Sequence, residues 1–401
     1  MTNNRKEGVI VIFSNHMDTI QLSRIRQIGE KAGEMAKAGR SVIKLQVGEP
    51  DFDTPQPIID AAIASLNRRE THYAHNRGTI ELRQALSEKL RRDNGIEADP
   101  VKNILTVCGC AEALLCAVVG LMDPGDEMIV IEPTFINYVQ LTRMAGCTPV
   151  IIRADENNGW LPDPEEIEKA VTPHTRLLLL NTPCNPTGTV YPLEILQEIA
   201  RIALKYNLIV ISDEVYEKLI YGAVKHISIA SLPGMAERTV TINGFSKAYA
   251  MTGWRLGYIA ADEALILPML KMHQYATTCL PVFVQAGALE ALQNGADAVE
   301  SMRKEYEHRR DVLAGMLRQI DGLKLDHVPD GTFYMYPNIS AFGLKSEEFV
   351  MRLLDETGVA TTFGTAFDQR GENNIRISFA NSLENLIEGA KRIGKFTAGL
   401  R

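Results

Sequence analysis

The chain has 401 residues, of which 45% are hydrophobic and 23% are charged, and its formal net charge is −8. This composition is typical of a globular protein with about two or three domains, and it excludes the disordered and fibrous classes. Because an acidic chain has no general attraction for phosphate backbones or anionic lipids, we expect no nucleic-acid partner and no membrane partner.

The N-terminal segment and the cysteines favour a cytoplasmic location. The apolar patch from Val9 to Phe13 is too short for the hydrophobic region of a secretory signal, and no small-residue cleavage site follows it. No stretch approaches the length of a membrane span. The six cysteines form no CxxC pair and have no histidine nearby at the spacing of zinc ligands, so we expect no disulfide framework and no metal site.

Strand and helix patterns alternate through most of the chain. Residues 103–109 predict a strand, residues 111–122 a helix, and residues 127–132 a second strand. Continuous apolar runs such as Leu177 to Leu180 suit strands that are buried on both faces. The alternation continues with a helix at 193–207 and with strands at 175–183, 208–214, 238–244 and 254–261. The predicted fold class is therefore α/β, with a mostly parallel sheet flanked by helices.

The pattern changes from about residue 285 onward. Long helical periodicity through residues 306–320 leads to short strands around residues 331–337 and 374–380. This change predicts a large domain over residues 48–285 and a smaller α+β domain over residues 286–401.

Several predicted strands end in residues that suit a bound ligand. In a parallel sheet the carboxyl ends of the strands meet at one edge, where ligands gather. The turn that opens the helix at 111–122 offers free backbone N–H groups and the positive end of a helix dipole, which suit a phosphate. The residues at these strand ends are Gly109, Cys110, Ala111, Asn185, Asp213, Tyr216, Ser246 and Lys247.

Each of these residues also has an ordinary structural explanation. Asp213 suits a helix cap, Asn185 a turn, Tyr216 a core position, and Lys247 a side chain that keeps its ammonium in water. Together, however, the phosphate cradle, carboxylate, phenol, amide and amine match the needs of pyridoxal phosphate, which requires a lysine for its Schiff base and an acid for its ring nitrogen. Motifs of the GxGxxG, GxxxxGK[ST] and GxSxG types are absent from the sequence.

Six stretches keep a fixed order and spacing from about residue 22 to the C-terminus. They are LQVGEPDFDTP (45–55), YAHNRGTIELRQAL (73–86), NTPCNPTG (181–188), SDEVYEKLIY (212–221), FSKAYAMTGWRLGY (245–258) and IRISFANS (375–382). With them the chain resembles class I aminotransferases of the fold type I pyridoxal-phosphate superfamily, near the bacterial aspartate aminotransferases. The resemblance implies a seven-stranded type of sheet, and it implies that residues 1–47 pack with the smaller domain.

The resemblance also implies roles around the cofactor ring. Lys247 would form the Schiff base and later carry a proton between the substrate Cα and the cofactor. Asp213 would pair with the ring nitrogen, Tyr216 and Asn185 would bond the ring 3-oxygen, and the ring would stack on Phe135. A free lysine has a pKa near 10.4, so we expect burial and the charge of a nearby arginine to lower the pKa of Lys247 and keep the amine reactive.

Phosphate and substrate contacts follow from the same resemblance. The phosphate would be bound by the backbone N–H groups of Cys110 and Ala111, by Arg255, and by Tyr73 reaching across from a second subunit, so a homodimer is implied. Arg376 would hold the substrate α-carboxylate, helped by the Gly48 backbone and Asn185, because a guanidinium binds a carboxylate with two parallel hydrogen bonds.

Two positions depart from the family pattern or lack a clear match. Gly244 stands where many relatives have a phosphate-binding serine, which shifts the predicted phosphate contacts toward Ser246 and Arg255. Arg77 is a candidate cation for a substrate side-chain carboxylate, although the preferred interpretation is a solvated loop charge.

The predicted function is amino acid:2-oxo acid transamination by a ping-pong cycle. The donor is aspartate, an aromatic amino acid or a neutral one, and the acceptor is 2-oxoglutarate or pyruvate. A β-eliminating lyase of the same superfamily is the alternative, since it would use the same cofactor residues. A regulator built on an aminotransferase module would normally carry a basic DNA-binding segment, and no such segment is found in the sequence.

Overall fold

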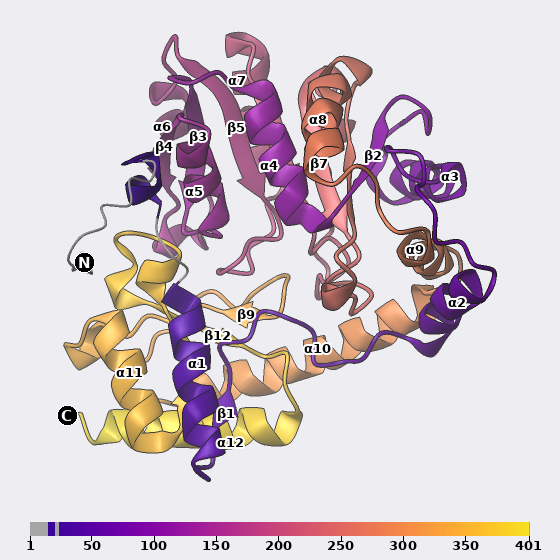
Figure 1. The fold of residues 1–401 in the computed structure, drawn as a ribbon. Coiled ribbons are helices and arrows are strands. Elements are labelled where there is room, and N and C mark those ends of the chain that lie inside the picture. Colours follow the sequence, from indigo (N-terminus) through magenta and orange to yellow (C-terminus); the bar gives the residue numbers. More distant parts are fainter. Residues whose placement is uncertain (1–14, 21–23, 401) are drawn as a thin grey trace, which may run out of the picture.

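The computed structural model describes residues 15–20 and 24–400, and the apolar patch from Val9 to Phe13 lies outside the described residues. Figure 1 shows two bodies, an upper one built on a sheet with helices around it and a lower one that contains the C-terminal end of the described chain. The domain boundaries near residues 48 and 286 stay a prediction. Within the described ranges, no helix combines the length and the apolar character that crossing a membrane requires.

The upper body contains a seven-stranded sheet in the order β2-β8-β7-β6-β5-β3-β4. All neighbouring pairs are parallel except those of β8, which runs antiparallel to both β2 and β7. The mostly parallel sheet is therefore confirmed. Strand β4 was not predicted, and its mostly exposed or half-buried residues explain why its sequence lacks a strong core pattern. The strands are β2 (Ile104–Val107), β3 (Glu127–Glu132), β4 (Thr148–Arg153), β5 (Thr175–Asn181), β6 (Ile209–Asp213), β7 (Thr239–Gly244) and β8 (Gly257–Ala260).

Both faces of this sheet are buried. Leu177 and Leu179 of β5 belong to one hydrophobic cluster with residues of α4 and α8, whereas Leu178 and Leu180 belong to another with residues of α7. Successive side chains of a strand point to opposite faces, so a continuous leucine run fills both layers. The covering helices are α4 (Gly109–Leu121), α5 (Asn137–Met144), α6 (Pro164–Lys169), α7 (Leu193–Tyr206) and α8 (Glu263–Ala276).

A third cluster lies at the side of the upper body, where helix α9 packs on α2 and α3. Leu82 and Leu86 of α3 and Ala288 of α9 are fully buried there. The helices are α2 (Gln56–Asn67), α3 (Ile80–Lys89) and α9 (Val282–Asn294).

The lower body is an α+β unit. Its small antiparallel sheet has the order β11-β12-β9, and its helices surround a core rich in phenylalanine and tyrosine. The elements are α10 (Ala296–Leu317), β9 (Tyr334–Met335), α11 (Ser346–Thr357), β10 (Val359–Ala360), β11 (Thr362–Phe363), β12 (Ile375–Ser378) and α12 (Leu383–Ala398).

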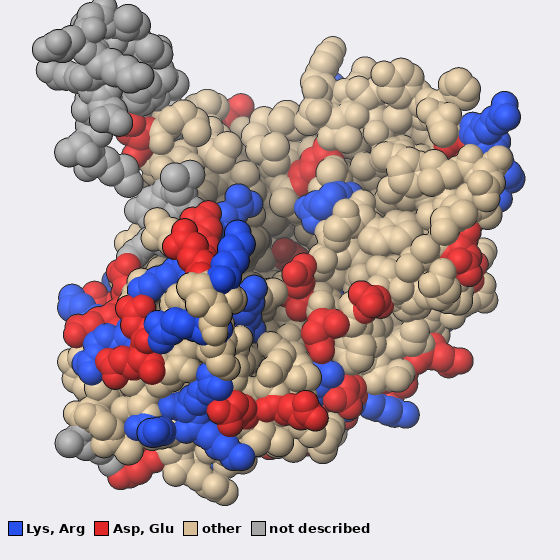
Figure 2. Space-filling view, turned by 60° about the horizontal axis from the view of Figure 1, so that its bottom comes forward, with Lys and Arg blue, Asp and Glu red and all other residues tan. Residues whose placement is uncertain are grey.

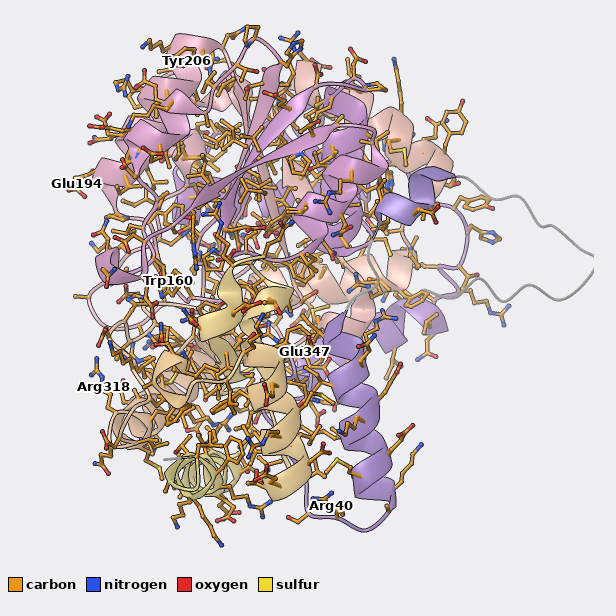
Figure 3. All side chains as sticks on the ribbon, turned by 90° about the vertical axis from the view of Figure 1, so that its left-hand side faces the viewer. Arg40, Trp160, Glu194, Tyr206, Arg318 and Glu347 are labelled. Atoms are coloured by element: carbon orange, nitrogen blue, oxygen red, sulfur yellow. The ribbon has the colours of Figure 1, made fainter. Side chains whose placement is uncertain are left out.

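Two N-terminal elements join the lower body, whereas the 3-10 helix Asn15–Thr19 contacts α5 of the upper body. Helix α1 (Arg24–Lys37) lies beside α11 in both Figure 1 and Figure 3, and an ion pair of 2.7 Å joins Lys31 to Asp355. Strand β1 (Ile43–Lys44) pairs in parallel with β10. The chain then enters the upper body, so the residues between β1 and α2 cross from one body to the other.

Candidate active site

A cavity of about 510 Å³ lies at the carboxyl ends of the parallel strands, where the two bodies meet. Figure 2 shows a recess near the centre of the face that it presents. The residues predicted for the site contribute to the cavity wall, with the exception of Gly109, Tyr73 and Arg77. These wall residues are Gly48, Cys110, Ala111, Phe135, Asn185, Asp213, Tyr216, Ser246, Lys247, Arg255 and Arg376.

Lys247 follows strand β7 and is half-buried in the cavity wall. Its Nζ donates a hydrogen bond of 2.6 Å to the backbone oxygen of Gly48. Burial lowers the pKa of Lys247 to about 8, and the positive charges of Arg376 and Arg255 act in the same direction. This agrees with the expected depression of the pKa, and at pH 7 it leaves roughly a tenth of the amine neutral, far more than in a free lysine.

Asp213 ends strand β6 and is buried. Its Oδ2 accepts a hydrogen bond of 2.9 Å from the Tyr138 hydroxyl, and its Oδ1 accepts one of 3.3 Å from the Val215 backbone N–H. Burial raises the pKa of Asp213 to about 6, while these hydrogen bonds oppose the rise. A buried carboxylate of this kind is stabilised by a cationic partner such as a protonated ring nitrogen. Tyr138 was missed by the sequence analysis, because an aromatic residue in a short helix ordinarily belongs to the core.

The start of helix α4 forms a cradle with Arg255. Gly109 has φ +74°, and a Cβ at this position would lie 2.6 Å from Nη2 of Arg255. At Gly257 a Cβ would lie 3.0 Å from the Cys110 backbone nitrogen. The two glycines therefore let the guanidinium and the β8 backbone approach the N–H groups that open the helix. Amide donors, a helix dipole and a guanidinium at one point fit a phosphate group.

The same region explains Gly244. A Cβ there would lie 3.1 Å from the Cys110 thiol and 3.1 Å from the Leu256 backbone oxygen, so the space for a serine side chain is already filled. Ser246 lines the cavity instead.

Arg376, on strand β12, is buried with one donor unused. Its Nη1 donates to Asn185 Oδ1 at 2.9 Å and its Nη2 to the Gln46 backbone oxygen at 2.8 Å, whereas Nε has no partner among the described residues. The guanidinium carbon lies 4.2 Å from the ring centre of Tyr334 and 4.7 Å from that of Phe367. An arginine of the cavity wall that is fixed between two rings suits a carboxylate ligand.

Tyr216 and Tyr334 form a pair at the floor of the cavity. Their hydroxyl oxygens lie 3.0 Å apart, and burial raises the pKa of Tyr216 well above its usual value. A Cβ at Gly48 would lie 2.9 Å from the Tyr334 hydroxyl oxygen, so a side chain there would displace this tyrosine. Tyr334 was also missed by the sequence analysis, which treated its segment as a strand without a role in the site.

Two of the predicted residues, Tyr73 and Arg77, lie outside the cavity. Tyr73 is 89% exposed and borders a separate surface hollow with Leu280 and Pro281. The preferred interpretation of Arg77 as a solvated loop charge is wrong. Its side chain is buried, and its Nη1 donates to the backbone oxygens of Val101 and Lys102 at 3.3 and 2.6 Å. Arg77 is also absent from the cavity wall of its own subunit.

The family model for aminotransferase class I and II matches residues 40–393. An aspartate aminotransferase of Pyrococcus abyssi is 44% identical over 96% of this chain and 97% of its own length, and aromatic-amino-acid aminotransferase 2 of Thermococcus litoralis is 41% identical over the same shares. The solved aspartate aminotransferase from Thermus thermophilus with maleate superposes with a TM-score of 0.92 and 37% identity, over 96% of this chain and all of that one.

The fold and the cavity define a pyridoxal-phosphate-dependent enzyme of fold type I. The chain belongs to the class I and II aminotransferases. The cradle at α4, the buried Asp213 and the amine of Lys247 fit the cofactor of this family. The comparisons give no support to the lyase alternative.

Proposed function

We propose that the enzyme transfers amino groups from aspartate, aromatic or neutral amino acids to 2-oxoglutarate or pyruvate, and that residues of the cavity wall bind the cofactor and the substrate. The observation that carries the proposal is the meeting of Lys247, Asp213 and Arg376 in one cavity wall. These three residues lie after β7, at the end of β6 and in β12, and they supply an amine, a carboxylate and a guanidinium. Transamination of an α-amino acid requires these three groups together.

Lys247 attaches the cofactor and moves the proton of the substrate Cα. The depressed pKa of its amine supports both tasks, since only the neutral amine attacks an aldehyde or accepts a proton. When bound, pyridoxal phosphate supplies the electron-accepting ring that amino acid side chains lack. Asp213 keeps the ring nitrogen protonated, and Tyr138 holds the carboxylate in place.

The remaining wall residues orient the reactants. Arg255, Ser246 and the N–H groups of Cys110 and Ala111 bind the phosphate at the start of α4. Phe135 lies beside the ring, and its T-shaped contact with Tyr138, at 5.9 Å between ring centres, limits its movement.

Substrate orientation depends on the residues around Arg376. The guanidinium binds the α-carboxylate with the donors that the protein leaves free, and Asn185 stays fixed because its Oδ1 accepts from Arg376. Tyr216 and the amide of Asn185 would bond the ring 3-oxygen, and the Gly48 backbone would contact the substrate. These residues would orient the substrate so that Lys247 can take the proton of its Cα.

We further propose that a homodimer is the active unit, with Tyr73 completing the partner's phosphate site. The support is that an 89% exposed tyrosine borders a hollow outside its own cavity. Tyr275, at the end of α8, is also 89% exposed. Large exposed aromatic side chains are typical of an interface.

We also propose a division into two domains and a cytoplasmic location. Pairing of β1 with β10 supports the grouping of residues 1–47 with a small domain at 286–401, beside a large domain at 48–285. All six cysteines are free, which supports a cytoplasmic location.

One experiment tests the reaction class. The yellow holoenzyme is mixed with each common amino acid in turn, and the absorbance change to the amine form of the cofactor is followed by stopped flow. We expect conversion without an added oxo acid, and reversal by 2-oxoglutarate or pyruvate. Release of ammonia and pyruvate from cysteine-type substrates, with no conversion by other amino acids, would instead identify a lyase.

A further inference from the structure

Helix α1 contributes one wall of the active-site cavity. Ile25, Arg26 and Gly29 line the cavity, although the helix packs with the lower body. Figures 1 and 3 both place the first turn of α1 at the junction with the upper body. A residue close to the N-terminus therefore faces the same space as Lys247 and Arg376.

Arg26 differs from the other cations of this wall. Lys247 donates to Gly48, Arg255 donates to Thr252, and Arg376 donates to Gln46 and Asn185. Arg26 is exposed, and across residues 15–20 and 24–400 no hydrogen bond or ion pair holds its side chain. Its charge is therefore available to a ligand in the cavity.

The local surroundings of Arg26 favour a negatively charged ligand. The first turn of α1 contains no acidic residue, and among the described residues Glu30, one turn further along the helix, forms no ion pair with Arg26. The wall also contains Glu49, but the Glu49 carboxylate already accepts a hydrogen bond of 3.1 Å from the Thr252 hydroxyl. A bound carboxylate would gain the attraction of Arg26 against some repulsion from Glu49.

The other charged groups of the wall are matched to the rest of the substrate and cofactor. Arg255 lies at the phosphate cradle and Asp213 at the ring nitrogen, while Arg376 faces the α-carboxylate with an unpaired, buried Nε. With these groups assigned, Arg26 is the described wall cation that has no counterpart in a monocarboxylic substrate. A second carboxylate on the substrate side chain supplies that counterpart.

We propose that Arg26 binds the side-chain carboxylate of the substrate, so that the enzyme favours dicarboxylic amino acids and dicarboxylic 2-oxo acids. This inference rests on the proposed function of the cavity and adds the residue that selects among its substrates. Arg26 comes from the N-terminal helix rather than from the sheet, so selection is separated in the fold from the groups that perform the chemistry.

The test compares Arg26→Gln with Lys37→Gln, which removes a positive charge from the same helix at an exposed position outside the cavity. For each protein, kcat/KM is measured with aspartate, glutamate, alanine and phenylalanine. The dissociation constant of succinate, an unreactive dicarboxylate, is measured by calorimetry. We expect Arg26→Gln to lower the ratio of kcat/KM for aspartate to that for alanine about tenfold, mainly through KM, and to weaken succinate binding similarly. Lys37→Gln should change neither quantity.

A third variant tests whether charge determines the binding of a dicarboxylate. Glu49→Gln removes the competing negative charge, so we expect tighter succinate binding in this protein, and adding Arg26→Gln should still weaken that binding about tenfold. An unchanged aspartate-to-alanine ratio in Arg26→Gln would overturn the inference while leaving transamination intact. An equal loss with all four amino acids would also overturn it, because the helix would then have a purely structural role. If the wild-type holoenzyme reacted with no amino acid, the proposed function would fail, and the selectivity of Arg26 would fail with it.

Discussion

The Tyr138 hydroxyl lies 2.9 Å from Oδ2 of Asp213, and this contact joins helix α5 to the end of strand β6 inside the candidate active site. Both side chains are buried, so the hydrogen bond is made where water cannot replace it. Burial raises the pKa of Asp213 to about 6, and donation by Tyr138 favours the ionised carboxylate. The ionised form is the one that pairs with a protonated ring nitrogen.

The variant Tyr138→Phe should therefore weaken cofactor binding most at low pH. A hydrogen bond to a charged acceptor contributes about 1.5–3 kcal/mol, so loss of the donor should raise the pKa of Asp213 by roughly one pH unit or more. Dissociation constants for pyridoxal phosphate, measured by equilibrium dialysis from pH 5.5 to 8.5, should begin to rise at a higher pH in the variant than in the wild type. Parallel curves for the two proteins would show that Tyr138 only fills space.

Lys247 should be the attachment point of the cofactor. Borohydride reduction of the holoenzyme, followed by digestion and mass spectrometry, should place the adduct on the peptide that contains Lys247. The variant Lys247→Arg keeps a positive charge but has no free amine, so it should give no adduct and lose about 10²–10⁴-fold in half-transamination rate. The exposed Lys205→Arg serves as the control. An adduct on another lysine would contradict the assignment.

The pKa of about 8 for Lys247 gives a second test on the apoenzyme. Only the neutral amine attacks the aldehyde, so the rate of cofactor uptake should rise with pH and reach half of its maximum near pH 8. A normal lysine would place this midpoint above pH 10. Stopped-flow absorbance after mixing apoenzyme with pyridoxal phosphate measures the profile.

Arg376→Lys should impair all amino acids alike. Lysine cannot offer parallel donors or stack between Tyr334 and Phe367, and it would leave Asn185 without its present partner. We expect KM to rise about 10- to 100-fold for both aspartate and alanine, with the spectrum of the bound cofactor unchanged. A loss confined to aspartate would move the α-carboxylate site elsewhere and assign Arg376 to the substrate side chain.

Local sequence patterns were sufficient to predict the sheet and most of its strands. The leucine run in β5 is strong because its residues alternate between two buried layers, and the polar residues after β5, β6 and β7 come together because parallel strands end at one edge. Strand β4 was missed because it is an edge strand with few buried residues. The backbone pairing with β3 stabilises β4 as a strand, although its own sequence lacks a buried pattern.

The missed site residues depend on contacts between distant parts of the chain. Arg26 reaches the cavity because α1 packs with α11 and β10, and Tyr334 reaches Tyr216 across 118 residues. No local pattern distinguishes these side chains from a solvated arginine or a core tyrosine. Arg77 is a loop arginine that the sequence suggested was solvated. It is buried because its guanidinium donates hydrogen bonds to backbone oxygens 24 and 25 residues away.

Tyr73 provides a test of the dimer that needs no structure of the complex. The test uses a hybrid dimer of one Lys247→Ala subunit and one Tyr73→Ala subunit. If Tyr73 serves the partner's cavity, the cavity of the Tyr73→Ala subunit has both residues intact. If Tyr73 serves its own cavity, neither cavity is intact. Mixing equal amounts of the two inactive or weakened proteins under subunit exchange should recover about a quarter of wild-type activity, since half of the dimers are hybrids with one good site of two. Absence of recovery, with hybrids verified by mass spectrometry, would confine Tyr73 to its own subunit.

Glu132 and Asp368 make the stability of the protein depend on pH. Glu132 ends strand β3 of the upper body, Asp368 follows β11 in the lower body, and Arg153 pairs with Asp368 at 3.1 Å. Burial and, to a lesser extent, the neighbouring Asp368 together raise the pKa of Glu132 to about 8. The folded protein therefore binds a proton at Glu132 that the unfolded chain releases near pH 4.5, and stability falls as pH rises from about 4.5 to about 8.

The variant Glu132→Gln should remove the fall in stability with rising pH, because an amide is neutral at every pH and can still donate a hydrogen bond to Asp368. We expect its free energy of unfolding to exceed that of the wild type by about 2 kcal/mol at pH 9 and to approach or fall below it at pH 5. Urea unfolding at both pH values measures the difference, with the exposed Glu194→Gln as the control. Because the two carboxyl groups belong to different bodies, like charges above pH 8 would push the two bodies apart at this contact as well as lower the stability. An equal effect of Glu132→Gln at both pH values would show that the shared proton is absent and that the contact depends on packing alone.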